Sequence, residues 1–281
     1  MSIERAIGKI THARLALILM AICIIILINP LFLPMRVSNL ANDFYGYVQR
    51  LQPGDKVLIS GSWGPANFNT LRTFYKALLN SIASKGARFV IWSVDPSFAG
   101  LVGTKPGEDG INLYCGFSGL YNYQYGVDYA YLPYLPGEET AIAAVAANIR
   151  SAISRDVYGT PIPDIPIFAA ANSLPDFKLA IFGEVSYTVP EMYVRQWPVK
   201  YEVATISYSL FSLIGAYYPR YIKGDLDSTT GYAEYEYLTK TPGEYILRMD
   251  VRNMNVTLTF VLIALTNIAI LQSRRKKVEA T

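Results

Sequence analysis

Hydroxyl and carboxylate side chains stand at the ends of several predicted strands, and their types and positions could do chemistry. The candidates for binding a ligand are Ser60, Ser62, Asp95, Glu138 and Glu184. Ligands of open parallel sheets bind outside the carboxyl ends of the strands, where such groups could hydrogen-bond a polar molecule or hold a hard cation. The alternative is that they are ordinary turn and helix-capping residues. We assign no catalytic residue, no metal ligand and no cofactor.

Chemistry that depends on an imidazole is excluded from the central part of the chain. The single histidine, His12, precedes the first apolar run, so the centre lacks the imidazole of a Ser-His-Asp, Cys-His or His-metal site. Cys23 lies inside that run and Cys115 in a polar loop, and we expect no disulfide between them. Asp225 and Asp227 resemble half of a calcium loop, but the later ligand positions do not fit, which indicates a solvated turn.

The elements that must position these groups begin with the stretch 54–65. Residues 56–60 form a near-continuous apolar strand, and 69–85 have the spacing of an amphipathic helix. With a second strand at 87–94, they predict a right-handed parallel βαβ unit. The turn Gly61-Ser62-Trp63-Gly64-Pro65 lacks the glycine spacing of a dinucleotide-binding fingerprint and the Gly-Lys-Ser/Thr of a phosphate-binding loop. It therefore predicts a tight strand-to-helix turn.

Strands and helices continue to alternate along the chain. Three further strands are expected at 127–135, 177–183 and 201–208, with helices at 138–154 and 189–197. This alternation predicts an α/β fold with a doubly wound, mostly parallel, five-stranded Rossmann-like sheet. The strands at 56–60 and 89–94 are expected to be adjacent and central. The segment 95–124 is a long Gly- and Tyr-rich loop, and loops of this length are often functional or mobile.

An apolar run lies near each end of the chain. Residues 15–33 follow Arg5, Lys9 and Arg14, and we favour a retained signal anchor over a cleaved signal peptide because no small-x-small cleavage site follows. Residues 254–271 precede the basic cluster 274–277, which indicates a cytoplasmic C-terminus. The alternative for the second run is a core helix with a basic tail.

These runs predict a two-pass protein of the cell membrane. Its parts are a cytoplasmic N-terminus at 1–14, membrane helices at 15–34 and 251–272, an extracytoplasmic α/β domain at 35–250 and a basic cytoplasmic tail at 273–281. Asn267 lies inside the second helix, where a polar side chain usually faces another helix. We expect it to face the first anchor, a second copy of the chain or another subunit. The partners are therefore the lipid bilayer and membrane proteins.

Charge gives no case for nucleic-acid binding, because the net charge is only +3 and is spread along the chain. The chain contains 22 tyrosines, whose amphipathic rings suit binding surfaces but also pack ordinary strands and loops.

Several short matches, spread from Gly54 to Ile268, resemble a family of uncharacterised, membrane-anchored α/β proteins from archaea and bacteria. The matching stretches are Tyr125-Gly126-Val127-Asp128-Tyr129, Pro136-Gly137-Glu138, Asp156-Val157-Tyr158-Gly159-Thr160-Pro161, Tyr218-Pro219, Gly224-Asp225-Leu226, Gly231-Tyr232-Ala233-Glu234-Tyr235-Glu236, Pro242-Gly243 and the apolar segment with Asn267. The resemblance implies the anchored α/β architecture and no reaction. The chain departs from the pattern at Asp227-Ser228-Thr229-Thr230, where the family has glycines.

The sequence favours a membrane-anchored non-enzymatic subunit or binding module whose outer domain docks on partner membrane or surface proteins. The alternatives are a receptor for a small polar ligand at the strand ends and a carboxylate-dependent hydrolase. A deep pocket that collects Asp95, Glu138 and Glu184 would favour the alternatives.

Overall fold

The computed structural model describes residues 12–29, 31–98, 122–184, 189–209, 216–241 and 243–279. It divides into two compact units, one formed by residues 36–241 and the other by the two ends of the chain, 1–35 and 242–281. Most of the predicted Tyr-rich loop, with Cys115, lies outside the described residues.

Residues 36–241 form an α/β unit around one parallel sheet. The sheet has six strands in the order β3-β2-β1-β4-β5-β6, all parallel in the described residues. The strands are β1 (Lys56–Ser62), β2 (Arg88–Trp92), β3 (Tyr129–Tyr131), β4 (Leu179–Glu184), β5 (Thr205–Ser209) and β6 (Ile222–Asp227). This order is that of doubly wound sheets, whose winding direction reverses between β1 and β4. The predicted parallel α/β sheet is confirmed, and so is the adjacency of β1 and β2.

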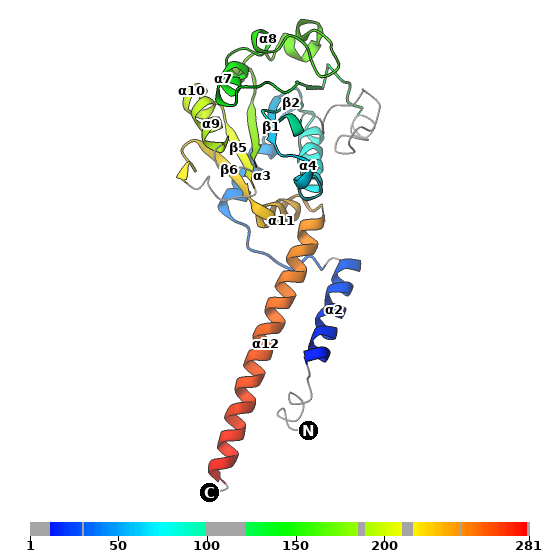
Figure 1. Cartoon of the computed structure of the whole chain (residues 1–281), viewed down its shortest axis with the longest axis vertical. Coiled ribbons are helices and arrows are strands. Elements are labelled where there is room, and N and C mark those ends of the chain that lie inside the picture. The colour runs from blue at the N-terminus through cyan, green and yellow to red at the C-terminus, as the bar shows by residue number, and fades with distance from the viewer. Residues whose placement is uncertain are drawn as a thin grey trace. The chain divides into compact units, whose positions relative to one another are not determined.

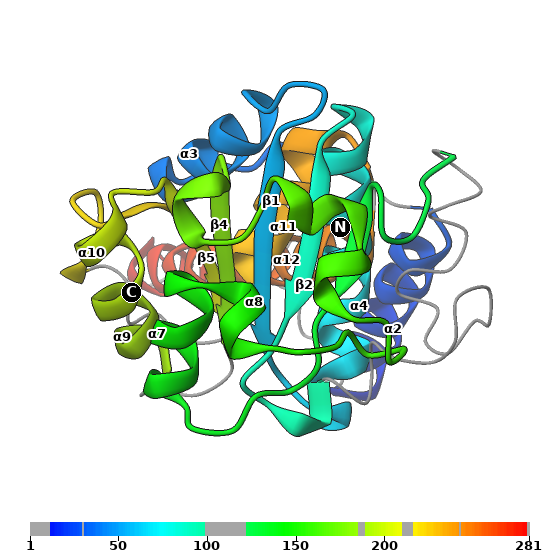
Figure 2. The same cartoon turned by 90° about the horizontal axis from the view of Figure 1, so that it is seen from above.

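Helices lie on both sides of the sheet (Figure 2). The larger ones are α3 (Asn39–Gln49), α4 (Pro65–Ser84), α7 (Glu139–Ala147), α9 (Val189–Gln196) and α11 (Ser228–Thr239). Shorter turns are α8 (Ile149–Ala152), α10 (Pro198–Tyr201), η1 (Ile162–Asp164), η2 (Pro166–Ala169) and η3 (Leu174–Asp176). The predicted helix at 138–154 is interrupted at Asn148, whose side-chain oxygen accepts a hydrogen bond from the Ser151 N–H and so begins α8.

The core is built on β1, whose side chains from Val57 to Ile59 are fully buried. Side chains alternate between the two faces of a strand. Leu58 and Phe182 pack with Tyr193 of α9 and with Trp197, which follows α9, on one face. On the other face, Phe74 of α4 packs against rings from β5 and α11. Burial of β1 on both faces explains its unbroken apolar sequence.

The prediction of five strands is wrong because the expected polar turn at 224–231 contains the end of a sixth strand, β6, and the start of α11. Gly224 makes the close packing possible, since a Cβ there would lie 2.3 Å from the backbone nitrogen of Phe44 in α3. Asp225 and Asp227 are strand residues, and Asp225 is only 3% exposed. The interpretation of this pair as a solvated turn is therefore corrected.

The two ends of the chain form α2 (His12–Ile28) and α12 (Glu244–Glu279), drawn in blue and in orange to red in Figure 1. Within the described residues, the segment Glu244–Leu271 of α12 is the one helix long and apolar enough to cross a membrane. The predicted span 15–34 is longer than the helix found there, because α2 ends at Ile28 and residues 31–34 are not helical. Its apolar part, Ala16–Ile28, covers about 20 Å at 1.5 Å per residue, against about 30 Å of hydrocarbon.

A buried carboxylate joins the end of α2 to α12. Asp250 accepts hydrogen bonds from three consecutive backbone N–H groups, those of Leu31, Phe32 and Leu33, at 2.9, 3.0 and 3.1 Å. Farther along α12, the Asn255 amide lies 3.9 Å from the Cys23 Sγ atom. A later residue of α12 therefore meets an earlier residue of α2. The two helices run antiparallel within this unit.

Candidate functional site

Four polar residues lie in one register row at the carboxyl ends of four neighbouring strands. Ser62 of β1 pairs with Glu184 of β4, Glu184 with Ser209 of β5, and Ser209 with Asp227 of β6. We call this set the carboxyl-edge row. It spans the β1–β4 boundary, where the winding of the sheet reverses and where open α/β sheets bind ligands. The row contains two of the residues that sequence reasoning proposed, Ser62 and Glu184.

A second row lies two residues earlier on the same face of the sheet. It consists of Ser60, Phe182, Ser207 and Asp225. The Ser60 hydroxyl is hydrogen-bonded to the hydroxyl of Tyr193, and the Tyr193 ring stacks on Phe182 with centroids 5.0 Å apart. Ser60 is fully buried. It therefore ties the sheet to α9 and does not reach the outer edge.

Asp225 is an ionisable group inside the core. Its Oδ1 accepts a hydrogen bond of 2.7 Å from the Ser207 hydroxyl, and both residues are buried. Burial raises the pKa of Asp225 from its ordinary value of 3.8 to about 7, the Ser207 hydrogen bond opposes this rise, and the charge of Asp227 adds to it.

The opposite face of the carboxyl edge is closed by aromatic rings. Gly61 and Gly183 are register partners on β1 and β4. A Cβ on Gly61 would lie 2.8 Å from the Phe98 ring, and one on Gly183 would lie 1.7 Å from the Tyr208 ring. The paired glycines therefore leave a flat area that these two rings occupy, with Trp63 centred 4.9 Å from Phe98. Burial raises the pKa of the Tyr208 hydroxyl well above its usual range.

Asp95 and Glu138 have other positions. The Asp95 carboxylate accepts a hydrogen bond of 2.8 Å from the backbone N–H of Ser97, in the first turn of a helix that begins at Pro96. Glu138 is exposed at the N-terminus of α7, with φ of 45° and no capping hydrogen bond from its side chain. Neither residue lines the cavities found in the described part of the chain. Their positions fit the capping and turn alternative for Asp95 and Glu138.

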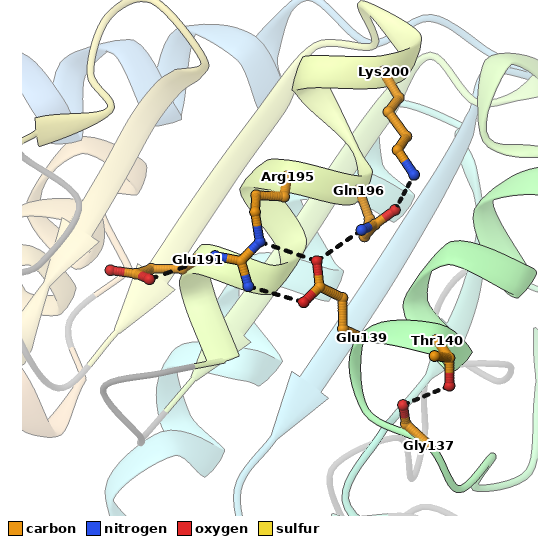
Figure 3. A network of polar contacts seen from close by, with 7 residues as sticks. All are labelled: Gly137, Glu139, Thr140, Glu191, Arg195, Gln196 and Lys200. Atoms are coloured by element: carbon orange, nitrogen blue, oxygen red, sulfur yellow. Dashed lines mark hydrogen bonds and ion pairs between the residues drawn. The ribbon is translucent and has the colours of Figure 1, made fainter.

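The next residue in the chain, Glu139, belongs to a network of polar contacts, which Figure 3 shows. The Arg195 guanidinium of α9 donates two hydrogen bonds to the Glu139 carboxylate, at 3.0 and 2.9 Å, and the Gln196 amide donates a third at 2.7 Å. These contacts lower the pKa of Glu139 to about 2, with the Arg195 hydrogen bonds as the largest cause. The network fastens α7 to α9, and we assign it a structural role.

Two adjacent cavities lie at the other edge of the sheet, beside the amino ends of the strands. One has a volume of about 650 Å³ and the other about 470 Å³, and Glu202 and Val203 line both. We call the pair the amino-edge groove. Its other charged residues are Arg50, Asp55 and Lys178 in the larger cavity and Arg220 and Lys223 in the smaller one. Sequence reasoning did not find this groove, because its residues come from four separate segments.

Ser209, Asp225 and Asp227 were also missed. Their signal is the alternation of polar and apolar residues in Thr205-Ile206-Ser207-Tyr208-Ser209 and Asp225-Leu226-Asp227, which is typical of strands.

No family model, curated protein or solved structure matches this chain.

The raised pKa of Asp225 predicts how stability depends on pH. The folded protein holds a proton there that the unfolded chain releases above about pH 4. The stability this contributes is fully present below pH 4 and is lost as the pH rises through 7.

Asp225→Asn keeps an acceptor for Ser207 and carries no charge. At pH 8 we expect the variant to be more stable than the wild type by about 1 to 4 kcal/mol, with a smaller difference at pH 5.

Denaturant unfolding of the full chain in detergent at both pH values measures this difference. Asp164→Asn, at an exposed aspartate, is the matched control and should change stability little at either pH. A gain for Asp225→Asn that is equal at pH 5 and pH 8 would contradict the assignment.

Proposed function

We propose that this protein is a membrane-anchored, non-enzymatic subunit whose α/β domain docks on partner membrane or surface proteins. Support comes from an apolar helix whose outward side chains include Phe260, 68% exposed, and Ile263, 52% exposed. A helix of this length with its apolar side chains exposed suits a lipid environment.

The observation that carries the proposal is where the cavities lie. A receptor for a polar ligand, or a carboxylate-dependent enzyme, would be expected to have Asp95, Glu138 and Glu184 together in one pocket at the carboxyl edge. Two cavities lined by described residues lie at the amino edge, and neither Asp95 nor Glu138 lines them. One face of the carboxyl edge is filled by the protein's own rings. This arrangement favours a surface that meets another protein.

We further propose that both ends of the chain cross the cell membrane, with both termini in the cytoplasm and the α/β domain outside. The antiparallel packing of α2 and α12 supports this arrangement, because it brings the N-terminal end of α2 and the C-terminal end of α12 to the same side. The basic residues that precede 15–33 and follow 254–271 favour the cytoplasmic side.

Topology can be measured with single cysteines in a chain that carries Cys23→Ser and Cys115→Ser. In intact cells, a membrane-impermeant maleimide should label Lys76→Cys, which replaces an exposed residue of α4, because the α/β domain lies outside. The same reagent should label Lys277→Cys in the basic tail only after lysis. Labelling of Lys277→Cys in intact cells would refute the proposed orientation.

Asn267 is the proposed contact with a partner in the membrane. Its side chain is exposed on α12, and it forms no hydrogen bond with the described residues of this chain. The neighbouring Thr266 is different, since its hydroxyl donates to the Leu262 carbonyl at 2.8 Å. An amide facing lipid lacks a hydrogen-bond partner, and a helix of a second copy or another subunit would supply one, worth about 0.5 to 2 kcal/mol.

Asn267→Leu should leave membrane insertion intact and shift the native complex toward smaller species, because it removes one interhelical hydrogen bond. Native electrophoresis in mild detergent measures the size, compared with the 31.3 kDa single chain. Thr266→Val is the matched control and should leave the complex unchanged, since that hydroxyl is already bonded within the helix. If chemical cross-linking of membranes shows the wild-type protein only as a monomer, the proposed function is refuted.

A receptor for a small polar ligand is the second candidate function, and the carboxyl-edge row favours it. Ser62 is 9% exposed and forms no hydrogen bond with a described residue. Its hydroxyl is therefore available to a ligand at the point where the winding reverses.

Native mass spectrometry of the detergent-purified protein tests this candidate. A small molecule that remains bound to the wild type should be retained several-fold less by Ser62→Ala, which removes one hydrogen bond. Ser84→Ala, at an exposed serine of α4, should retain it fully. If neither the wild type nor the variants carry a small molecule, the receptor candidate fails.

A further inference from the structure

The amino-edge groove carries more positive than negative charge. Arg50, Lys178, Arg220 and Lys223 lie along it, against Asp55 and Glu202. None of the four cations forms an ion pair with a described residue. Acidic residues outnumber basic ones in the whole segment 36–241, so this surplus is local to the groove.

Two of the cations are held in place by aromatic rings. The Arg50 guanidinium lies 5.1 Å from the ring centroid of Tyr47, and the Arg220 guanidinium lies 5.1 Å from that of Tyr221. Stacking of this kind reduces the freedom that an arginine loses when it binds an anion. Arg50 also follows the C-terminus of α3, where a cation suits the helix dipole. Lys178 and Arg220 do not interact with the dipole of α3 in this way, because they lie on other segments.

The backbone between the two cavities also presents hydrogen-bond donors. Glu202 ends α10 in the left-handed conformation, with φ of 53° and ψ of 17°. The backbone N–H groups of Glu202 and Val203 donate to no backbone carbonyl of the described residues. A left-handed residue after a helical one turns successive N–H groups toward one side, which forms a concavity that binds anions. A non-glycine residue in this conformation is strained, and such strain is typical of binding sites.

The shape of the groove favours an extended ligand. Two cavities share one wall at Glu202 and Val203, and the cations are distributed over both. Apolar side chains of Phe177 and Leu179 line the larger cavity, and Tyr201 lies beside them. Tyrosine and arginine are enriched at protein interfaces. A chain of carboxylates on a polypeptide fits this pattern better than a single free anion.

We propose that the amino-edge groove binds an acidic segment of the partner protein, with carboxylates held by Lys178 and Arg220 and by the N–H groups at Glu202 and Val203. This inference rests on the proposed docking function and names the chemistry of the partner. Arg50 and Lys223 add attraction at the two ends of the groove.

Fluorescence anisotropy of a fluorescein-labelled oligoglutamate peptide tests the groove directly, with the full-length protein in detergent micelles. The wild type should bind the peptide, and affinity should fall as salt is added. The double variant Lys178→Glu/Arg220→Glu should weaken binding by at least about tenfold. Lys76→Glu/Lys240→Glu is the matched control, with two exposed lysines outside both cavities, and should leave affinity within about twofold.

Three outcomes overturn the inference: equal losses in both double variants, unchanged binding in the groove variant, or no binding of oligoglutamate by the wild type. Competition by inorganic phosphate at far lower concentration than by unlabelled oligoglutamate would also overturn it, because the groove would then take a free anion. The peptide-binding result does not depend on the size of the native complex. A wild-type protein that does not bind oligoglutamate, but whose native complex keeps its size, would refute the groove and leave the docking function standing.

Discussion

The pairing of Gly61 with Gly183 across β1 and β4 is the constraint on which the carboxyl edge depends. Two adjacent strands without side chains at this level allow the rings of Phe98 and Tyr208 to lie flat against the sheet. A methyl group at Gly183 would occupy the position of the Tyr208 ring itself. One face of the edge is therefore filled by the chain, and the polar row remains on the other face. The same pairing places Ser62 beside Glu184 one residue later.

Burial of Asp225 shows that the face of the sheet with the polar row is not an ordinary apolar core. A carboxylate is costly to ionise inside a protein even with hydrogen bonds from the Ser207 hydroxyl and the Leu226 backbone, and the raised pKa expresses that cost. Asp227 lies two residues on in the same strand and increases the cost through its charge. A strand of this composition at the sheet edge is explained by the close packing of α3 on Gly224, which holds β6 against β5.

The two units differ in how their charged and polar groups are placed. In residues 36–241, the groups that carry charge are distributed between an aromatic-closed carboxyl edge and a cationic groove at the amino edge. In the unit formed by the ends of the chain, the apolar helices leave few polar groups to satisfy. Asp250 takes up three backbone N–H groups that follow α2 and would otherwise lack partners where the helix has ended.

The sequence by itself determined the alternation of strands and helices, the parallel pairing of β1 with β2 and the long apolar helix near the C-terminus. These features are local, because the apolar run at 57–59 and the periodicity of α4 reflect burial along one element. Only the tertiary structure decided which polar residues meet. Register across four strands joined Ser62 to Asp227, and packing of α3 turned an apparent polar loop into β6. The groove around Glu202 has no local signature, because residues from four segments form it, and its chemistry exists only where the fold brings them together.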